Sequence, residues 1–134
     1  MQTKTLIAGL ASGVITFLLG WLVFGILLMD YYNAHSFHYT GIMKNPPVIW
    51  AIGLGNLSWG IMIAYILSLS GIKSAAKGFT TGFIVFLLAI AGFDLLFYGT
   101  VNLYGLRITS IDILLNALMG GVSGAVAALV LGRK

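Results

Sequence analysis

The stretch "FTTGFIVFLLAIAGFDLLFYGTV", residues Phe79–Val101, decides the fold class. Its single charged residue is Asp94, and as a helix it is long enough to cross the roughly 30 Å of hydrocarbon in a bilayer. A segment in lipid has to be helical, because a lone strand would leave its backbone N–H and C=O groups unpaired. The sequence therefore predicts a transmembrane helix that carries one carboxyl group.

Three further apolar segments have the same character: Leu6–Met29, Pro47–Leu69 and Ile111–Leu131. Of the 134 residues, 60% are hydrophobic and 7% are charged, and the mean hydropathy is +1.05. A soluble domain carries about 25% charged residues, so this chain has too little polar surface for water. We predict an all-α membrane protein, in which residues 1–134 form one domain of four transmembrane helices in the lipid bilayer.

The composition also limits the chemistry. The chain has no cysteine, which excludes disulfides, thiol nucleophiles and Cys-based metal sites. Its basic residues are scattered singly, so the net charge of +4 does not indicate a nucleic-acid partner. The sequence has no nucleophile elbow, phosphate-binding loop or HExxH motif. We therefore name no catalytic residue and expect neither an enzyme nor a cofactor.

The basic residues predict the orientation of the spans. The side that holds both termini and the middle loop has no acid and five basic residues: Lys4, Lys73, Lys77, Arg133 and Lys134. The other side has only Lys44 and Arg107. Because basic residues are retained in the cytoplasm, we predict that both termini are cytoplasmic. The acids Asp30, Asp94 and Asp112 then lie toward the outside.

Local patterns predict where two helices start. Asn45 followed by Pro46 and Pro47 is typical of the start of a helix, where a proline loses no hydrogen bond. The four residues "TSID", Thr109–Asp112, have the pattern of a capping box that would open the fourth span.

The first and third spans, and likewise the second and fourth, show an internal repeat. Nine of the 24 residues from Lys4 to Leu27 recur 69 positions later: Lys4, Gly9, Gly13, Ile15, Phe17, Leu18, Leu19, Phe24 and Leu27. Leu54, Asn56 and Gly60 recur 60 positions later. We interpret this as two tandem helical hairpins, residues 4–70 and 73–134, related by a parallel pseudo-two-fold axis along the membrane normal. The alternative is the shared composition of lipid-facing helices.

Small residues four positions apart predict helix contacts, because they let two backbones approach closely. The candidate packing residues are Gly9, Gly13, Gly60, Gly78, Gly82, Gly120 and Gly124. Inside a four-span protein, we expect these positions to serve the bundle itself.

Asp94, Asn56 and Asn116 form a candidate polar cluster. All three lie roughly 8–14 Å below the outer surface, counted along their spans. A lipid-facing Asp or Asn is costly, so each should point inward, and Tyr98 shares the helix face of Asp94. We predict a pocket in the outer leaflet that binds a proton, an ion or a small ligand. The alternative is a purely structural role, in which these groups fix the helix register.

His35 and His38 are candidate metal ligands on the outer face, because His-x-x-His places two imidazoles together if the segment is helical. Asp30, Asp112 or Tyr39 could complete such a site for zinc or copper. The spacing fixes no other ligand, so ordinary loop histidines are the alternative and no metal is predicted. The five tyrosines toward the same side indicate an aromatic belt at the membrane interface: Tyr31, Tyr32, Tyr39, Tyr98 and Tyr104.

The motif Asn-x-x-x-Gly stands in both even spans, as "NLSWG" from Asn56 and "NALMG" from Asn116. With four spans and a duplicated hairpin, the chain resembles small uncharacterised four-span proteins of the bacterial inner membrane that are catalogued as domains of unknown function. That resemblance implies a fold and a bacterial inner membrane, but no activity. The small multidrug-resistance transporters have a similar length, yet their signature Glu in the first span is missing from this sequence.

Three functions follow from these patterns. The first is the handling of a small ligand or ion at the outer-leaflet pocket, as in a proton-coupled carrier that works as a homodimer or larger oligomer. The second is a structural or accessory subunit of a larger membrane complex. The third is a metal or redox module on the outer face.

Overall fold

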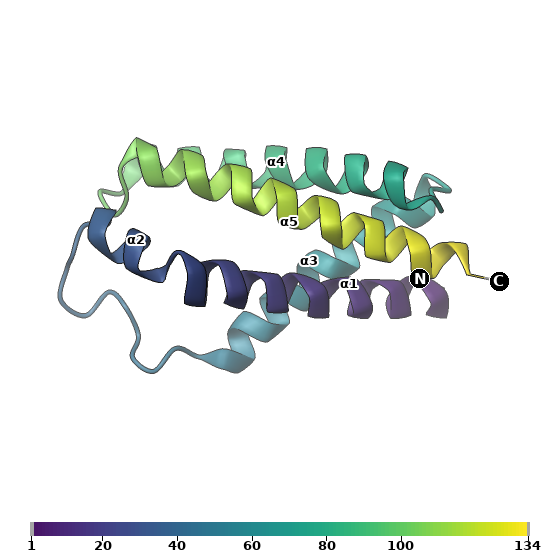
Figure 1. Cartoon of the computed structure of the whole chain (residues 1–134), viewed down its shortest axis with the longest axis horizontal. Coiled ribbons are helices and arrows are strands. Elements are labelled where there is room, and N and C mark those ends of the chain that lie inside the picture. Colours follow the sequence, from purple (N-terminus) through teal and green to yellow (C-terminus); the bar gives the residue numbers. More distant parts are fainter. Residues whose placement is uncertain (1, 134) are drawn as a thin grey trace.

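The computed structural model describes residues 2–133, which form a bundle of helices (Figure 1). Helix α1 (Thr3–Leu22) passes through a π-helical turn, η1 (Val23–Leu27), into the short helix α2 (Met29–His35). The other long helices are α3 (Ile49–Leu69), α4 (Ala75–Thr100) and α5 (Leu106–Gly132). Within these residues, four segments are long and apolar enough to cross a membrane: Thr3–Leu27, α3, α4 and α5. The predicted all-α, four-span membrane fold is confirmed.

The chain starts and finishes at the same end of the bundle (Figure 1). We call this the proximal end, which also holds the turn at residues 70–74. The opposite, distal end holds α2 and the connections at residues 36–48 and 101–105. Every candidate polar residue predicted from the sequence belongs to the distal half or the distal connections.

The proximal turn is short because glycine ends α3 sharply. Gly71 has a positive φ of 65°, which is a conformation that side-chain-bearing residues rarely adopt. The N–H of Ile72 then donates to the carbonyl of Leu67 at 3.0 Å, and Gly71 donates to Ser68 at 3.3 Å. This Schellman pattern satisfies the last carbonyls of α3. Ser74 caps the next helix by accepting a hydrogen bond from the N–H of Lys77.

Two predicted helix starts need correction. The capping box at Thr109–Asp112 is wrong, because α5 already starts at Leu106, with Gly105 as its N-cap. The hydroxyls of Thr109 and Ser110 instead donate to the carbonyls of Gly105 and Leu106, four residues earlier. Such back-bonding satisfies a hydroxyl inside a helix that has no water around it. Helix α3 starts at Ile49, two residues after the predicted Pro47.

The candidate packing glycines lie where helices of one hairpin cross. A methyl group added at Gly9 of α1 would lie 2.7 Å from the Cα of Ile61 in α3. A methyl group added at Gly13 would lie 2.7 Å from the Cα of Leu57. In the second hairpin, an added methyl at Gly78 would lie 2.5 Å from the Cβ of Ala128. The remaining four glycines also contact the partner helix of their own hairpin: Gly60, Gly82, Gly120 and Gly124. Each hairpin therefore depends on close backbone contact.

Hydroxyl groups join the two hairpins. Ser12 of α1 donates to the carbonyl of Ser123 in α5 at 3.0 Å, and Thr16 donates to the hydroxyl of Ser123 at 3.1 Å. All three side chains are buried. Of the four spans, α5 is the most buried. The apolar core lies around this contact and toward the proximal end. It consists of Ala8, Ile63, Ala64, Leu67, Phe86, Ala127, Ala128 and Leu131.

The internal repeat stays a prediction. Both hairpins pack through a pair of glycines on their first helix, but in different registers. Gly60 contacts the first pair, Gly9 and Gly13, whereas Gly124 contacts the second pair, Gly78 and Gly82. In the sequence alignment the counterpart of Gly124 is Ala64, which lies one turn after Gly60. The contact is therefore shifted by one helical turn between the hairpins. The two units also differ at the distal end, where α1 gives way to η1 while α4 continues as a regular helix to Thr100.

Candidate functional site

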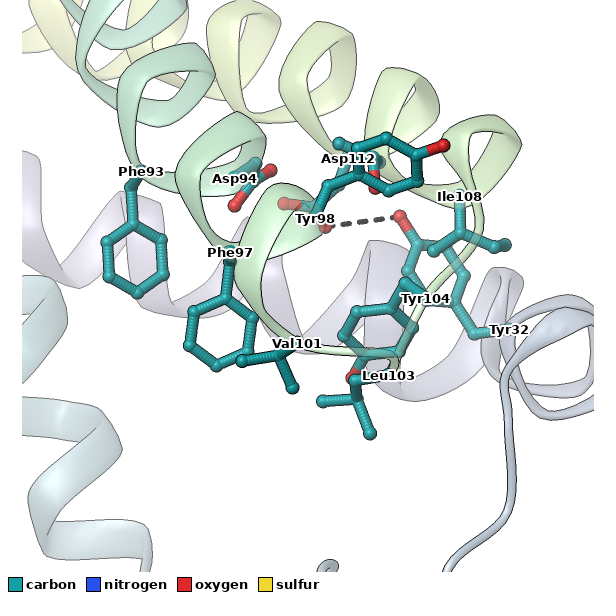
Figure 2. A pocket seen from close by; sticks show the side chains of 11 residues that line it. Tyr32, Phe93, Asp94, Phe97, Tyr98, Val101, Leu103, Tyr104, Ile108 and Asp112 are labelled. Carbon is teal, nitrogen blue, oxygen red and sulfur yellow. Dashed lines mark hydrogen bonds between the residues drawn. The ribbon is translucent and has the colours of Figure 1, made fainter.

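The distal end of the second hairpin forms a partly open cavity of about 370 Å³, which we call the distal cavity (Figure 2). Its wall comes from α2, α4, α5 and the connection between the last two helices. The residues that line it are Tyr32, Phe93, Asp94, Phe97, Tyr98, Val101, Leu103, Tyr104, Ile108, Thr109 and Asp112. The lining is aromatic and aliphatic except for two carboxyl groups and a few hydroxyls.

Asp94 and Asp112 face each other across this cavity, one from each helix of the hairpin (Figure 2). Both side chains line the same cavity and lie near one another in Figure 2. The Oδ2 atom of Asp94 is buried, and no N–H or O–H group of the described residues donates to it. A buried carboxylate oxygen without a donor is unfavourable, so a proton or a cation is the partner that Asp94 lacks.

Asp112, in contrast, accepts a hydrogen bond at each oxygen. The hydroxyl of Tyr32 donates to Oδ1 at 3.1 Å, which is the dashed line in Figure 2. The side-chain amide of Asn116 donates to Oδ2 at 2.9 Å from one turn further along α5. With both oxygens of Asp112 already accepting, Asp94 is the carboxyl group of the pair that lacks a donor among the described residues.

Tyr32 reaches Asp112 because the distal connections fold back over the hairpin. The N–H of Phe37, just after α2, donates to the carbonyl of Leu103 at 3.1 Å, in a short antiparallel contact between the two connections. The ring of Phe24 packs edge-on against Tyr32 with centroids 5.5 Å apart. The first hairpin thus contributes a donor to a site in the second.

The electrostatics of the site act on two tyrosines outside the spans. Burial raises the pKa of Tyr32 above its ordinary value, and the charge of Asp112 and the hydrogen bond to it raise that pKa further. Burial also raises the pKa of Tyr104, with the charges of Asp112 and Asp94 as further causes. Among the described residues, the lining holds no Lys, Arg or His that could balance the acids. The cavity therefore combines two carboxyl groups with aromatic walls and, within residues 2–133, no basic side chain.

The structure brings together only part of the polar cluster expected from the sequence. Asn116 joins it through Asp112, and Tyr98 lies in the wall without a hydrogen bond among the described residues. Asn56 is elsewhere: its amide donates to the carbonyl of Ile52 in its own helix, and it lines a second cavity between the hairpins. Asp30 is exposed on α2.

The two candidate histidine ligands do not form a pair on one helix face. Helix α2 ends at His35, so His38 lies in the extended segment beyond it. His35 stacks on Tyr31 with centroids 4.2 Å apart, and its Nδ1 lies 2.9 Å from the carbonyl of that residue. Within residues 2–133, no three His, Cys, Asp or Glu side chains come together as metal ligands.

Three residues of the site were not predicted as its members. Asp112 was named only as a metal candidate, and Tyr32 and Tyr104 were assigned to the aromatic belt. One signal was available for Asp112, since it stands four residues before Asn116 and so shares its helix face. No pattern in the sequence could place Tyr32, because its position depends on the fold of the distal connections.

This chain matches no protein-family model, no curated protein and no solved structure.

Proposed function

We propose that this integral membrane protein binds a small cation at the distal cavity, in exchange for the proton of the Asp94–Asp112 pair. The buried Oδ2 of Asp94, which no donor reaches, is the observation that supports this function. Two facing carboxyl groups repel one another when both are ionised. A proton relieves that repulsion, and so does a cation bound between them.

The walls favour an organic ammonium ion over a bare metal ion. A metal ion needs several oxygen or nitrogen ligands at short range, whereas most of this lining is aromatic or aliphatic. Aromatic faces attract ammonium groups through their quadrupoles, and this attraction is stronger where water is excluded. A volume of about 370 Å³ accommodates a small organic cation together with a few water molecules.

In this proposal the protein sits in a bacterial inner membrane with both termini in the cytoplasm, so the distal cavity opens toward the outside. Four helices enclose little space for a transport path, so we propose that a carrier function requires a homodimer. Chemical cross-linking in mild detergent tests that part. A strictly monomeric protein would favour binding without transport.

The test of the binding site is calorimetric titration of the purified protein with tetramethylammonium, in two buffers that differ in ionisation enthalpy. Binding should release a proton, so the measured heats should differ between the buffers in proportion to their ionisation enthalpies. Asp94→Asn cannot exchange a proton and should lose this binding. Asp30→Asn is the matched control, because Asp30 is an acid at the same end but outside the cavity.

If the wild type does not bind tetramethylammonium at any pH tested, the proposal is overturned. It is also overturned if Asp94→Asn binds tetramethylammonium as tightly as the wild type does. In that case a structural or accessory subunit of a larger complex becomes the better explanation, with the carboxyl pair as a contact between helices.

A further inference from the structure

A second, larger cavity of about 690 Å³ lies between the two hairpins, and we call it the inter-hairpin cavity. All four long helices contribute to its wall. It exists because α3 packs on α1 and α5 but makes few contacts with α4, and in Figure 1 α3 crosses the bundle at an angle to the other helices. The distal half of α3 therefore stands away from the second hairpin.

The wall of this cavity is aromatic and aliphatic, with two amides set into it. Trp21, Trp59 and Phe86 are among its large apolar side chains. Asn56 of α3 and Asn116 of α5 also line it. Asn56 lies seven residues into its helix and Asn116 ten, which corresponds to about 10 Å and 15 Å along the helix axes from their distal ends.

Both amides donate within the protein, Asn56 through one N–H and Asn116 through two, and neither amide oxygen accepts a hydrogen bond from the described residues. Asn56 donates to the carbonyl of Ile52 at 2.8 Å, and Asn116 donates to the carbonyl and the carboxyl group of Asp112. Because both side chains line the cavity, their amide oxygens are two hydrogen-bond acceptors available to a ligand bound there. An unsatisfied acceptor in the apolar layer costs free energy that a ligand with a donor would recover.

We infer that the inter-hairpin cavity binds a lipid-soluble molecule that carries a hydroxyl group on an apolar body. The apolar walls take up the body, and the hydroxyl donates to Asn56 or Asn116. The volume is in the range of pockets that bind such molecules. This site is separate from the cation site of the distal cavity and does not depend on it, although both use α5.

The test uses the tryptophans of the cavity as reporters. In protein carrying Trp50→Phe, only Trp21 and Trp59 remain, and both line the cavity. Reconstituted in phospholipid vesicles, this protein is titrated with bromododecanol, whose bromine quenches tryptophan fluorescence. Bromododecane, which lacks the hydroxyl group, measures the quenching that comes from dissolution in the lipid alone. We expect saturable quenching by bromododecanol, and only weak, non-saturable quenching by bromododecane.

Two glycine substitutions on α3 make a matched pair. A methyl group added at Gly55 or at Gly53 would meet no atom within 4 Å, so neither site resists a larger side chain. Gly55 lines the cavity, whereas Gly53 does not. Gly55→Leu should fill the space and weaken bromododecanol binding at least about tenfold. Gly53→Leu should bind as the starting protein does.

Asn56→Leu tests the hydrogen bond, because it keeps the size of the side chain and removes one acceptor. It should weaken the quenching by bromododecanol, and the double variant Asn56→Leu/Asn116→Leu, which lacks both acceptors, should be quenched by bromododecanol no more than by bromododecane. Three results would overturn the inference: quenching by bromododecanol without saturation, equal quenching by the two probes in the unaltered cavity, or equal effects of the two glycine substitutions.

Discussion

At the scale of single residues, the position of Asp94 in the membrane is unfavourable in free energy. A carboxylate in the hydrocarbon layer costs about 2.5–3.5 kcal/mol on insertion scales. The protein lowers that cost by turning Asp94 toward Asp112 instead of toward lipid. Asp112 is in turn held by Tyr32 and Asn116. The result is one well-bonded carboxyl group facing one that lacks a donor, which is an arrangement suited to taking up a proton or a cation.

The tyrosines around the pair give a first prediction. Burial and the charge of Asp112 raise the pKa of Tyr32, and similar causes raise the pKa of Tyr104. Two of the six tyrosines should therefore ionise above the ordinary range when tyrosinate absorbance is followed with rising pH. Asp112→Asn removes a negative charge and an acceptor, so it should lower the pKa of Tyr32 toward the ordinary value. An unchanged titration curve in that variant would contradict the geometry of the site.

Asp94 could be named as a candidate from the sequence, because a carboxyl group inside an apolar span is rare and energetically costly. The partner of Asp94 could not be predicted, because it depends on the rotation of α5 about its axis. That rotation follows from where the glycines of the second hairpin meet. It also follows from the start of α5 at Leu106 instead of near Ile111. Asn56 was misplaced for the same reason, since the tilt of α3 separates it from the second hairpin.

At the scale of elements, the helices of each hairpin are held by glycine contacts and the hairpins by hydroxyl groups. Membrane helices gain little from leaving lipid for one another, so close packing and polar contacts have to provide the association. The α1–α5 contact through Ser12, Thr16 and Ser123 is of this kind. Such contacts contribute on average about 0.6 kcal/mol each.

Gly82 and Gly92 of α4 test the packing argument. A methyl group at Gly82 would meet the backbone of α5, with the Cα of Gly124 only 3.1 Å away, whereas at Gly92 it would meet nothing within 4 Å. Gly82→Ala should lower the stability of the protein by about 1–3 kcal/mol, as overpacking does. Gly92→Ala should leave it equal or slightly higher, because alanine favours the helix.

Unfolding in mixed detergent micelles measures the stability of both variants. If Gly82→Ala were as stable as Gly92→Ala, the helices of the second hairpin would not meet at Gly82.

The four membrane spans could be predicted from the sequence, but the residues at which the helices start and end could be predicted less accurately. Hydropathy depends on composition over a whole segment, so all four spans were identified from the sequence alone. Helix ends depend on single hydrogen bonds, and in α5 the hydroxyls of Thr109 and Ser110 bond inside the helix instead of capping it. The π-helical turn at Val23–Leu27 and the short α2 were not predicted, because the apolar pattern runs through the turn without interruption.

At the scale of the whole molecule, the two hairpins differ in structure at their distal ends. The carboxyl pair belongs to the second hairpin, and the position aligned with Asp94 in the first is Gly25, in the π-helical turn. Gly25 lines the inter-hairpin cavity. If the units are related by duplication, as the sequence pattern predicts, their distal halves have diverged, and the glycine pair on the first helix was kept while the register of its contact changed.

The orientation of the molecule can be tested directly, because the chain has no cysteine. Single cysteines at Ser70, in the proximal turn, and at Thr40, in the distal connection, both lie at exposed positions. A thiol reagent that cannot cross membranes should label Thr40→Cys in intact cells, and should label Ser70→Cys only after the membrane is opened. The reverse pattern would place the distal cavity on the cytoplasmic side.

The most direct test of the central claim, that Asp94 and Asp112 share a proton, is the thermal stability of wild type and Asp94→Asn from about pH 5 to 9. At the alkaline end, the wild type would carry two facing negative charges, so we predict that Asp94→Asn unfolds at a higher temperature there. At the acidic end the shared proton binds the pair, and the advantage of the variant should vanish or reverse. Asp30→Asn should follow the wild type throughout. If Asp94→Asn were less stable than the wild type at every pH, Asp94 would be a structural contact between helices and the claim of a proton-exchanging pair would be wrong.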